Sequence, residues 1–211
     1  ADITAFTRPV YVIILPFSGR GRNDDIPNQL QWLIHHDNYT IICLSLDVVV
    51  DAEYGNLTDP DICAYWIARI RAGKVIGMIA GPPCETWTIA RWNFLEHGHS
   101  PPVLRTALYP WGRPRLGRKH YQQVYTSNKL LQITLTFFTH LILSGGFAIA
   151  EHPAEPTWKP QAASIFRLAV TTWLKKAPGV QIVKVSQGIH GQISEKPTEL
   201  LALRTPTLKQ H

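Results

Sequence analysis

Acidic residues are scarce in this sequence, in which 15 Asp and Glu stand against 21 Lys and Arg and the net charge is +6. Cysteine is scarce too. Cys43, Cys63 and Cys84 are irregularly spaced, which excludes a disulfide framework and zinc-like pairs and favours a reducing compartment such as the nucleus or cytoplasm. Polar residues interrupt the most apolar stretch, at 130–150, so we expect no membrane span. The 211 residues, 45% hydrophobic, suit one globular domain.

The positive charge is concentrated in one segment, residues 105–120, which contains no acid. Such a cluster favours a polyanionic partner, and we predict nucleic acid. The alternative is a solvated loop that keeps the protein soluble. The candidate nucleic-acid-binding residues are Arg91, Arg105, Arg113, Arg115, Arg118 and Lys119.

Strand-like and helix-like hydrophobic patterns alternate along the chain. Strands are expected at residues 11–15, 40–46, 74–80, 147–150 and 180–186. Helices are expected at residues 26–35, 59–72, 121–143 and 162–175, with Asp59 as a cap before Pro60 and with Gly145-Gly146 after the helix at 121–143. The alternation predicts an α/β fold, a single domain over residues 1–211 with a doubly wound, mostly parallel, Rossmann-like sheet and an irregular basic insertion at about 85–120.

Residues able to carry chemistry follow four of the expected strands. Ser18 follows the first strand, Asp47 the second, Cys84 the third and Glu151 the fourth. Ligands of such sheets bind beyond the carboxyl ends of the strands, so these residues should meet at one rim.

The segment after the first strand, Phe17-Ser18-Gly19-Arg20-Gly21, has glycines that allow a ligand to approach the backbone closely. Asp47 is placed to bind ribose hydroxyls, and Asp61 is a candidate for an adenine amino group. The alternative is that both are loop or helix-cap aspartates.

Cys84 follows two prolines at a strand end, which fix the direction of the backbone. Beside a cation such as Arg91, its thiol is expected to have a lowered pKa and to act as a nucleophile. The alternative is a buried structural cysteine. Glu151 is the candidate acid, and His152 either orients Glu151 or packs. A cysteine hydrolase that pairs Cys84 with His152 is a weaker alternative.

These motifs resemble those of the cytosine-C5 methyltransferases. Phe17-Ser18-Gly19-Arg20-Gly21 resembles the family's Phe-x-Gly-x-Gly loop, Pro83-Cys84 its catalytic Pro-Cys, and Glu151-His152-Pro153 its Glu-Asn-Val. The full pattern is more similar to divergent methyltransferase-like domains of retroelement-rich eukaryotic genomes, which share Gly-Pro-Pro-Cys-Glu-Thr-Trp, Trp-Gly, Glu-His-Pro, and Gln-x-x-x-Gly before Lys-Pro-Thr.

The resemblance implies that S-adenosylmethionine is the cofactor and that carbon 5 of a cytosine is methylated, in DNA more than in RNA. The cytosine must be unpaired or flipped out of its duplex. It assigns Cys84 as the nucleophile that adds to carbon 6 and Glu151 as the acid at ring nitrogen 3. The cofactor residues would be Phe17, Ser18, Gly19, Gly21, Asp47, Asp61 and Pro82.

The sequence also departs from the family. Leu15-Pro16 replaces the acid before the glycine loop, the Gln-x-Arg-x-Arg element and the closing Asn-Ser/Ala-Val motif are missing, and there is no separate target-recognition domain of the usual size. These departures support a second hypothesis, an inactive methyltransferase-like domain that serves as a binding or scaffold part of a larger chain or complex.

Overall fold

The computed structural model describes residues 8–20, 25–34, 36, 38–92, 101–190 and 196–209. These residues form a six-stranded sheet with the order β2-β1-β3-β4-β6-β5. The strands are β1 (Val10–Pro16), β2 (Thr40–Leu46), β3 (Val75–Ala80), β4 (Phe147–Pro153), β5 (Val180–Ser186) and β6 (Pro197–Leu203). The first four strands pair in parallel, whereas β6 runs antiparallel to β4 and β5. The predicted α/β class and mostly parallel sheet are confirmed.

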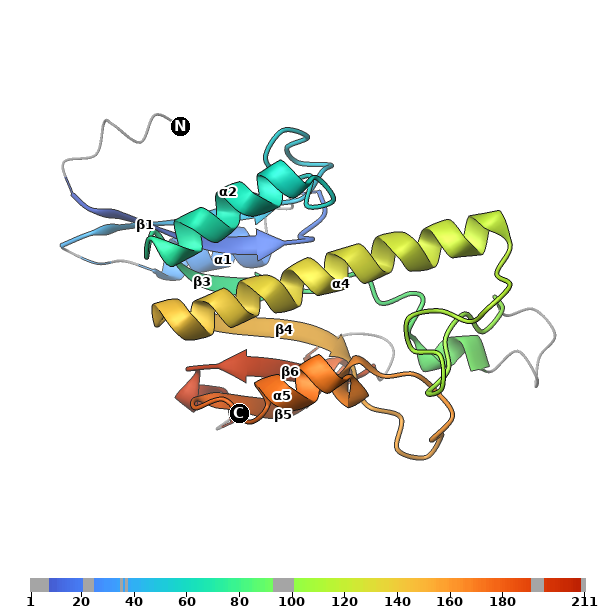
Figure 1. Cartoon of the computed structure of the whole chain (residues 1–211). Coiled ribbons are helices and arrows are strands. Elements are labelled where there is room, and N and C mark those ends of the chain that lie inside the picture. The colour runs from blue at the N-terminus through green and yellow to red at the C-terminus, as the bar shows by residue number, and fades with distance from the viewer. Residues whose placement is uncertain are drawn as a thin grey trace.

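Helices connect the parallel strands. They are α1 (Ile26–Leu33), α2 (Pro60–Arg71), α4 (Arg118–Ser144) and α5 (Ala169–Leu174), with short 3-10 helices at Ile89–Trp92, Ile165–Arg167, Gln187–His190 and Pro206–Lys209. α2 and α4 pack side by side, and α4 crosses β3 and β4 (Figure 1). The β1-to-β2 and β2-to-β3 connections run in opposite directions across the sheet, so right-handed crossovers place α1 on the face opposite α2 and α4.

The core lies between the sheet and the layer formed by α2 and α4. Phe137, Phe138 and Leu141 of α4 are fully buried there, together with Met78 of β3 and Ile70 of α2. None of the side chains of α1 is buried. Among the helices that the structure describes, none combines the length and the apolar character that crossing a bilayer requires.

Local sequence signals located several element ends correctly. The side chain of Asp59 caps α2 by accepting a hydrogen bond from the N–H of Asp61 at 2.8 Å, and Pro60 opens the helix. Gly145 ends α4 in the left-handed conformation, with φ of 83°. The expected strand at 40–46 coincides with β2, and the one at 180–186 with β5.

Two expectations about the carboxyl-terminal third were wrong. The helix expected at residues 162–175 is broken into Ile165–Arg167 and α5, because Leu168 between them has an extended backbone with ψ of 143°. The strand β6 was not expected at all. It lies between β4 and β5 and buries residues on both faces, so its sequence lacks the alternation of a half-exposed strand.

Candidate active site

The carboxyl ends of β1, β2, β3 and β4 meet at one edge of the sheet, as their parallel pairing requires. β2 lies on one side of β1 in the sheet, and β3, the next strand along the chain, lies on its other side. The position between the carboxyl ends of β1 and β3 is therefore the topological switch point of the sheet. A cavity of about 370 Å³ opens there, lined by the ends of β1 and β3, the start of α1, and Glu151 and Gln187. Cavities of this size hold small-molecule ligands.

The loop after β1 presents both polar and backbone groups at this cavity. Phe17 and Ser18 line it, and Phe17 has a φ of 63°, a strained value for a bulky residue. The hydroxyl of Ser18 is buried and has no hydrogen-bond partner among the described residues. Gly19 has a φ of 70° and open space where a Cβ would lie. These features fit a polar nucleoside-type cofactor. Gly21 lies outside the described residues.

The two candidate aspartates do not line the cavity. Asp47 accepts hydrogen bonds from the backbone N–H of Gly19 at 3.0 Å and of Val49 at 2.9 Å, so it fastens the end of β2 to the loop after β1. These bonds fit the interpretation of Asp47 as a loop aspartate. Asp61 is exposed in the first turn of α2. Pro82 is buried directly after Gly81, which does line the cavity.

Cys84 begins a turn that is fastened to α4. Its carbonyl oxygen accepts a hydrogen bond from the N–H of Trp87 at 2.9 Å. Ser127 of α4 donates its hydroxyl to the carbonyl of Pro83 at 3.2 Å. The same hydroxyl accepts hydrogen bonds from Thr86 at 3.1 Å and from the indole N–H of Trp87 at 3.3 Å. One buried serine therefore fixes the backbone on both sides of Cys84.

The thiol of Cys84 is half-buried, and its electrostatics correct the sequence-based prediction. Burial raises the pKa of Cys84, and the positive charge of Lys196 opposes this shift while the charge of Glu151 adds to it. The prediction that Arg91 lowers this pKa is wrong, because the cation that acts on the thiol is Lys196. Lys196 is not one of the predicted site residues.

Glu151 is the centre of a polar cluster. Its Oε1 accepts hydrogen bonds from Gln187 at 3.2 Å, from Lys196 at 3.3 Å and, more weakly, from Thr198 at 3.5 Å. Its Oε2 lies beside Gly81, where an added Cβ would be 3.5 Å away. Lys196 and Thr198 come to the rim because β6 begins there, antiparallel to β4. Because β6 was not predicted, Lys196 and Thr198 were not predicted as members of the site. The Lys-Pro-Thr run that contains them is part of the family resemblance.

His152 points to the opposite face of β4 from Glu151 and is only 1% exposed. Its ring lies 5.8 Å from the ring of Trp87 and 6.4 Å from that of Phe166, both edge to face. Neither ring nitrogen has a partner among the described residues. Burial lowers the pKa of His152 to about 3, so the ring is neutral. His152 packs, and this contradicts the alternative of a Cys84–His152 hydrolase pair.

The basic cluster divides into buried and exposed members. Arg105 is 2% exposed, and its guanidinium lies 4.0 Å from the ring centroid of Trp87. It donates hydrogen bonds to Thr86 at 3.0 Å and Asn128 at 2.6 Å, and to the carbonyls of Pro110 and Val124. Thr86 in turn bonds to Ser127, so Arg105 supports the Cys84 turn.

Arg91 is also buried, and it donates to the carbonyls of Glu85 and Pro102. The prediction that Arg91 and Arg105 contact nucleic acid is therefore wrong, because their guanidinium groups are used inside the protein. The four remaining candidates are exposed: Arg113, Arg115, Arg118 and Lys119.

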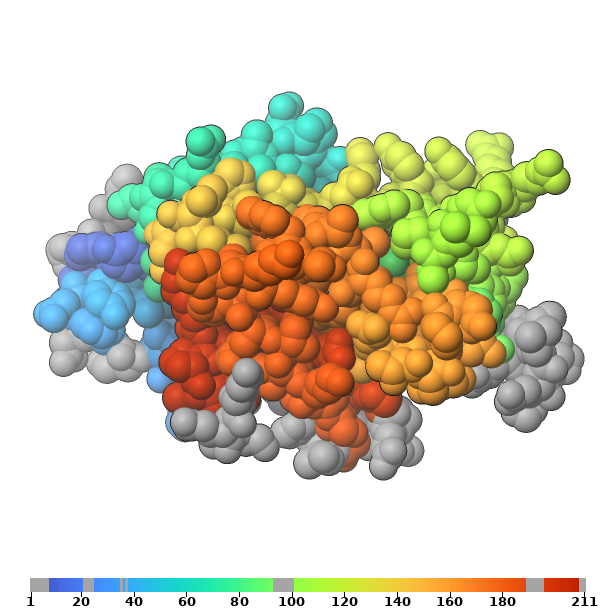
Figure 2. Space-filling view, turned by 60° about the horizontal axis from the view of Figure 1, so that its bottom comes forward, coloured from blue at the N-terminus to red at the C-terminus, as the bar shows by residue number. Residues whose placement is uncertain are grey.

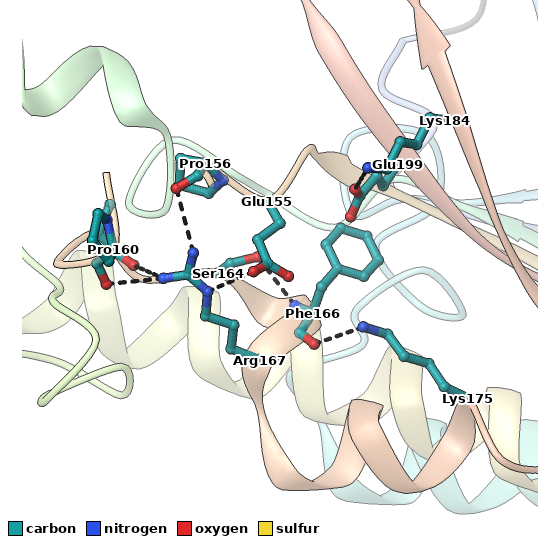
Figure 3. Close-up of polar contacts among 10 residues, drawn as sticks. Glu155, Pro156, Pro160, Ser164, Phe166, Arg167, Lys175, Lys184 and Glu199 are labelled. Carbon is teal, nitrogen blue, oxygen red and sulfur yellow. Dashed lines mark hydrogen bonds and ion pairs between the residues drawn. The ribbon is translucent and has the colours of Figure 1, made fainter. Parts of the chain in front are cut away.

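A second cavity, of about 390 Å³, lies between residues 87–90 and the loop after β4. Arg167 holds that loop by an ion pair with Glu155 at 2.8 Å and by bonds to the carbonyls of Pro156 and Pro160 (Figure 3). Lys196 lines this second cavity and bonds to Glu151, which lines the first. The Lys196–Glu151 pair therefore stands between two cavities.

The insertion and the loop after β4 are joined. The N–H of Ala107 donates to the carbonyl of Gln161 at 2.8 Å, and the ammonium of Lys159 lies 5.4 Å from the ring centroid of Trp92. In the space-filling view the two segments, green and orange, form one lobe at one end of the molecule (Figure 2). The insertion is therefore part of the same folded unit as the sheet.

No protein-family model matches the chain, and no curated protein sequence matches it significantly. The geometry of the site is therefore what indicates a function. A thiol, a carboxyl group and an ammonium group stand together at one rim, with a cavity on either side of the Lys196–Glu151 pair. Such an arrangement is suited to group transfer between two ligands.

Proposed function

We propose that this chain is a methyltransferase-like domain that transfers a methyl group from S-adenosylmethionine to carbon 5 of cytosine in a nucleic acid, with DNA favoured. One observation carries the proposal. The turn that bears Cys84 follows β3, Glu151 lies two residues before the carboxyl end of the neighbouring strand β4, and the glycine loop follows β1 on the other side of β3. Phe17–Gly19, Cys84 and Glu151 are far apart in the sequence and follow or belong to three neighbouring strands, so they lie along one edge of the sheet.

The cavity at the switch point is the proposed cofactor site. Its apolar walls fit a nucleoside group, as does the hydroxyl of Ser18, which has no partner in the described part of the chain. Gly81 lets the contents of the cavity approach Glu151 closely. S-adenosylmethionine supplies the methyl group when it is bound. Asp47 contributes by holding the backbone of Gly19 rather than by lining the cavity.

In the proposed reaction, the sulfur of Cys84 as thiolate forms a bond to carbon 6 of the base. The electron pair of the carbon 5–carbon 6 double bond moves into the ring, where Glu151 stabilises it through a hydrogen bond at nitrogen 3. Carbon 5 then forms a bond to the methyl carbon, whose bond to the sulfonium sulfur of the donor breaks and leaves a neutral thioether. A solvent base takes the proton from carbon 5, the electron pair of that carbon–hydrogen bond restores the double bond, and the carbon 6–sulfur bond breaks to release Cys84 as thiolate. Lys196 favours the thiolate because its charge lowers the pKa of Cys84.

The second candidate is a non-catalytic domain that binds a ligand or holds a larger assembly together. Two observations favour it: burial raises the pKa of Cys84, and each oxygen of Asp47 already accepts a backbone hydrogen bond. Calorimetric titration with S-adenosylmethionine separates the two candidates. Binding that is weakened by Ser18→Ala supports the enzyme, whereas no binding to the folded protein supports the scaffold.

The catalytic proposal is tested with S-adenosylmethionine labelled in its methyl group and oligonucleotides that contain cytosine. We expect label on cytosine with the unmodified protein and with Cys63→Ser, a control cysteine on α2. Cys84→Ser should give none above background, and Glu151→Gln should lower the rate about 100-fold. Equal incorporation by Cys84→Ser and the unmodified protein would refute the cysteine mechanism.

A further inference from the structure

The amino-terminal half of α4 extends beyond the sheet. The helix has 27 residues and is about 40 Å long, whereas a seven-residue strand such as β4 spans about 23 Å. The end of α4 drawn in yellow-green reaches past the strands toward the insertion (Figure 1). Between residues 118 and 129 only Val124 and Ser127 are buried. This half of the helix therefore presents most of its surface to solvent.

Uncompensated positive charge collects at this end of the helix. Arg113, Arg115, Arg118 and Lys119 are exposed, and none of them forms an ion pair within the parts of the chain that the structure describes. The sequence has no Asp or Glu from residue 97 to residue 150. Arg118 and Lys119 also occupy the first turn of α4, where the helix dipole disfavours cations. An anionic partner would offset both effects.

Aromatic rings lie next to these cations. Tyr121 and Tyr125 are one helical turn apart and are 59% and 44% exposed, with ring centroids 6.2 Å apart and an interplanar angle of 21°. Trp111, 40% exposed, lies close by, since Asn128 donates a hydrogen bond to its carbonyl at 2.9 Å. Exposed ring faces beside a cationic track are the elements with which proteins bind single strands, because unpaired bases stack on such rings.

A groove connects this end of α4 with the Cys84 turn. It has a volume of about 430 Å³ and runs between Pro83 and Glu85 on one side and Lys119, Gln122 and Thr126 on the other. The amide and hydroxyl groups along the helix side can bond to phosphates or to base edges. Because Pro83 and Glu85 flank Cys84 in the chain, the groove lies beside the turn that bears the proposed nucleophile.

From these observations we infer that the amino-terminal half of α4 binds a single strand of nucleic acid. The binding surface, called the α4 surface below, comprises Arg113, Arg115, Arg118, Lys119, Tyr121 and Tyr125. The cations bind phosphates, the tyrosine rings stack on bases, and the groove leads the strand to Cys84. Delivery of a base to Cys84 rests on the proposed function, whereas strand binding does not. A duplex is disfavoured because its bases are stacked inside it and cannot reach the rings.

The test is fluorescence anisotropy with labelled strands of about 15 nucleotides, as DNA, as RNA and as the DNA duplex of the same sequence. We expect either single strand to bind at least about tenfold more tightly than the duplex. Tyr121→Ala and Tyr125→Ala should each weaken single-strand binding about tenfold. Lys119→Gln should reduce the dependence of log affinity on log salt by about 0.7. The matched controls are Trp173→Ala and Lys176→Gln, both exposed near α5, which should bind as the unmodified protein does.

Tighter binding of the duplex, or tyrosine variants that bind as the controls do, would overturn this inference. All five substituted residues are exposed, and thermal melting verifies that each variant is folded. Strand binding is measured without S-adenosylmethionine and needs no reaction, so a failure of methyl transfer leaves the binding result intact. Conversely, methyl transfer that the tyrosine substitutions leave unchanged would refute the α4 surface and not the proposed function.

Discussion

The two halves of the sheet are covered very differently. On the β3–β4 half, α4 packs its buried side chains onto the sheet, and Ser127 fastens the Cys84 turn to that helix. On the β1–β2 half, α1 buries no side chain, and in β2 only Leu46 is buried. The proposed nucleophile Cys84 and acid Glu151 belong to the well-packed β3–β4 half. The loop after β1, which is proposed to bind the cofactor, belongs to the β1–β2 half. Elements with few buried contacts open most easily, so ligand binding should order the β1–β2 half more than the β3–β4 half.

The largest effect is expected when the packed half loses Arg105. Arg105→Met leaves buried acceptors on Thr86 and Asn128 without their donor and should lower the free energy of unfolding by about 3 kcal/mol. Urea denaturation measures this change. Arg113→Met, an exposed control from the same cluster, should change stability by less than about 0.5 kcal/mol. Equal effects of the two substitutions would refute the division of the cluster into buried and exposed members.

Acid should also weaken the packed half through His152. The pKa of this residue is about 3 in the folded protein and 6.5 for an unperturbed histidine, so between pH 6.5 and pH 3 the unfolded chain gains its proton and the folded chain does not. Stability should fall by about 1.4 kcal/mol per pH unit from this group as the pH drops from 6.5 toward 3. His152→Phe removes the titrating group and preserves an aromatic ring, so its unfolding curves should depend less on pH. An unchanged dependence would mean that His152 is not neutral in the fold.

A smaller effect is expected in the other half, from Asp47. Asp47→Ala removes the acceptor for the N–H groups of Gly19 and Val49 and should cost about 1 kcal/mol. The amide of Gly19 should then exchange its hydrogen faster, which NMR can follow, while amides of β4 keep their rates. Unchanged exchange at Gly19 would show that Asp47 does not hold the loop.

The smallest effect is expected at Trp32 of α1, which is 81% exposed. Trp32→Ser removes a large ring from the thinly packed half and should change the free energy of unfolding by no more than about 0.5 kcal/mol. Thermal melting is sufficient to measure it. A loss of several kcal/mol would mean that α1 contributes packing that its exposure does not indicate.

The parallel part of the fold could be predicted because its signals are local. Asp59 and Pro60 start α2, Gly145 ends α4, and apolar runs mark β1 to β4. The strand β6 could not be recognised, since it is buried on both faces and begins with Pro197. Lys196 and Thr198 were missed with it, because their approach to Glu151 depends on the antiparallel pairing.

The basic cluster shows a second limit. Arg105 and Arg113 belong to the same stretch of sequence, yet one is buried against Trp87 and the other is exposed. Charge patterning gives the sign and location of a cluster. Which members face solvent depends on long-range partners, here Thr86 and Asn128.

Cys84, Glu151 and Lys196 form one site, in which both charged side chains act on the thiol. The direct measurement is the pH dependence of alkylation of Cys84 by iodoacetamide, with Cys43 and Cys63 replaced by alanine so that a single thiol reacts. Lys196→Met should raise the pKa of the thiol and shift the curve to higher pH, because a nearby positive charge is lost. Glu151→Gln should shift it to lower pH, and Lys184→Met, an exposed control on β5, should not move it. Curves that superimpose for all four proteins would contradict the account.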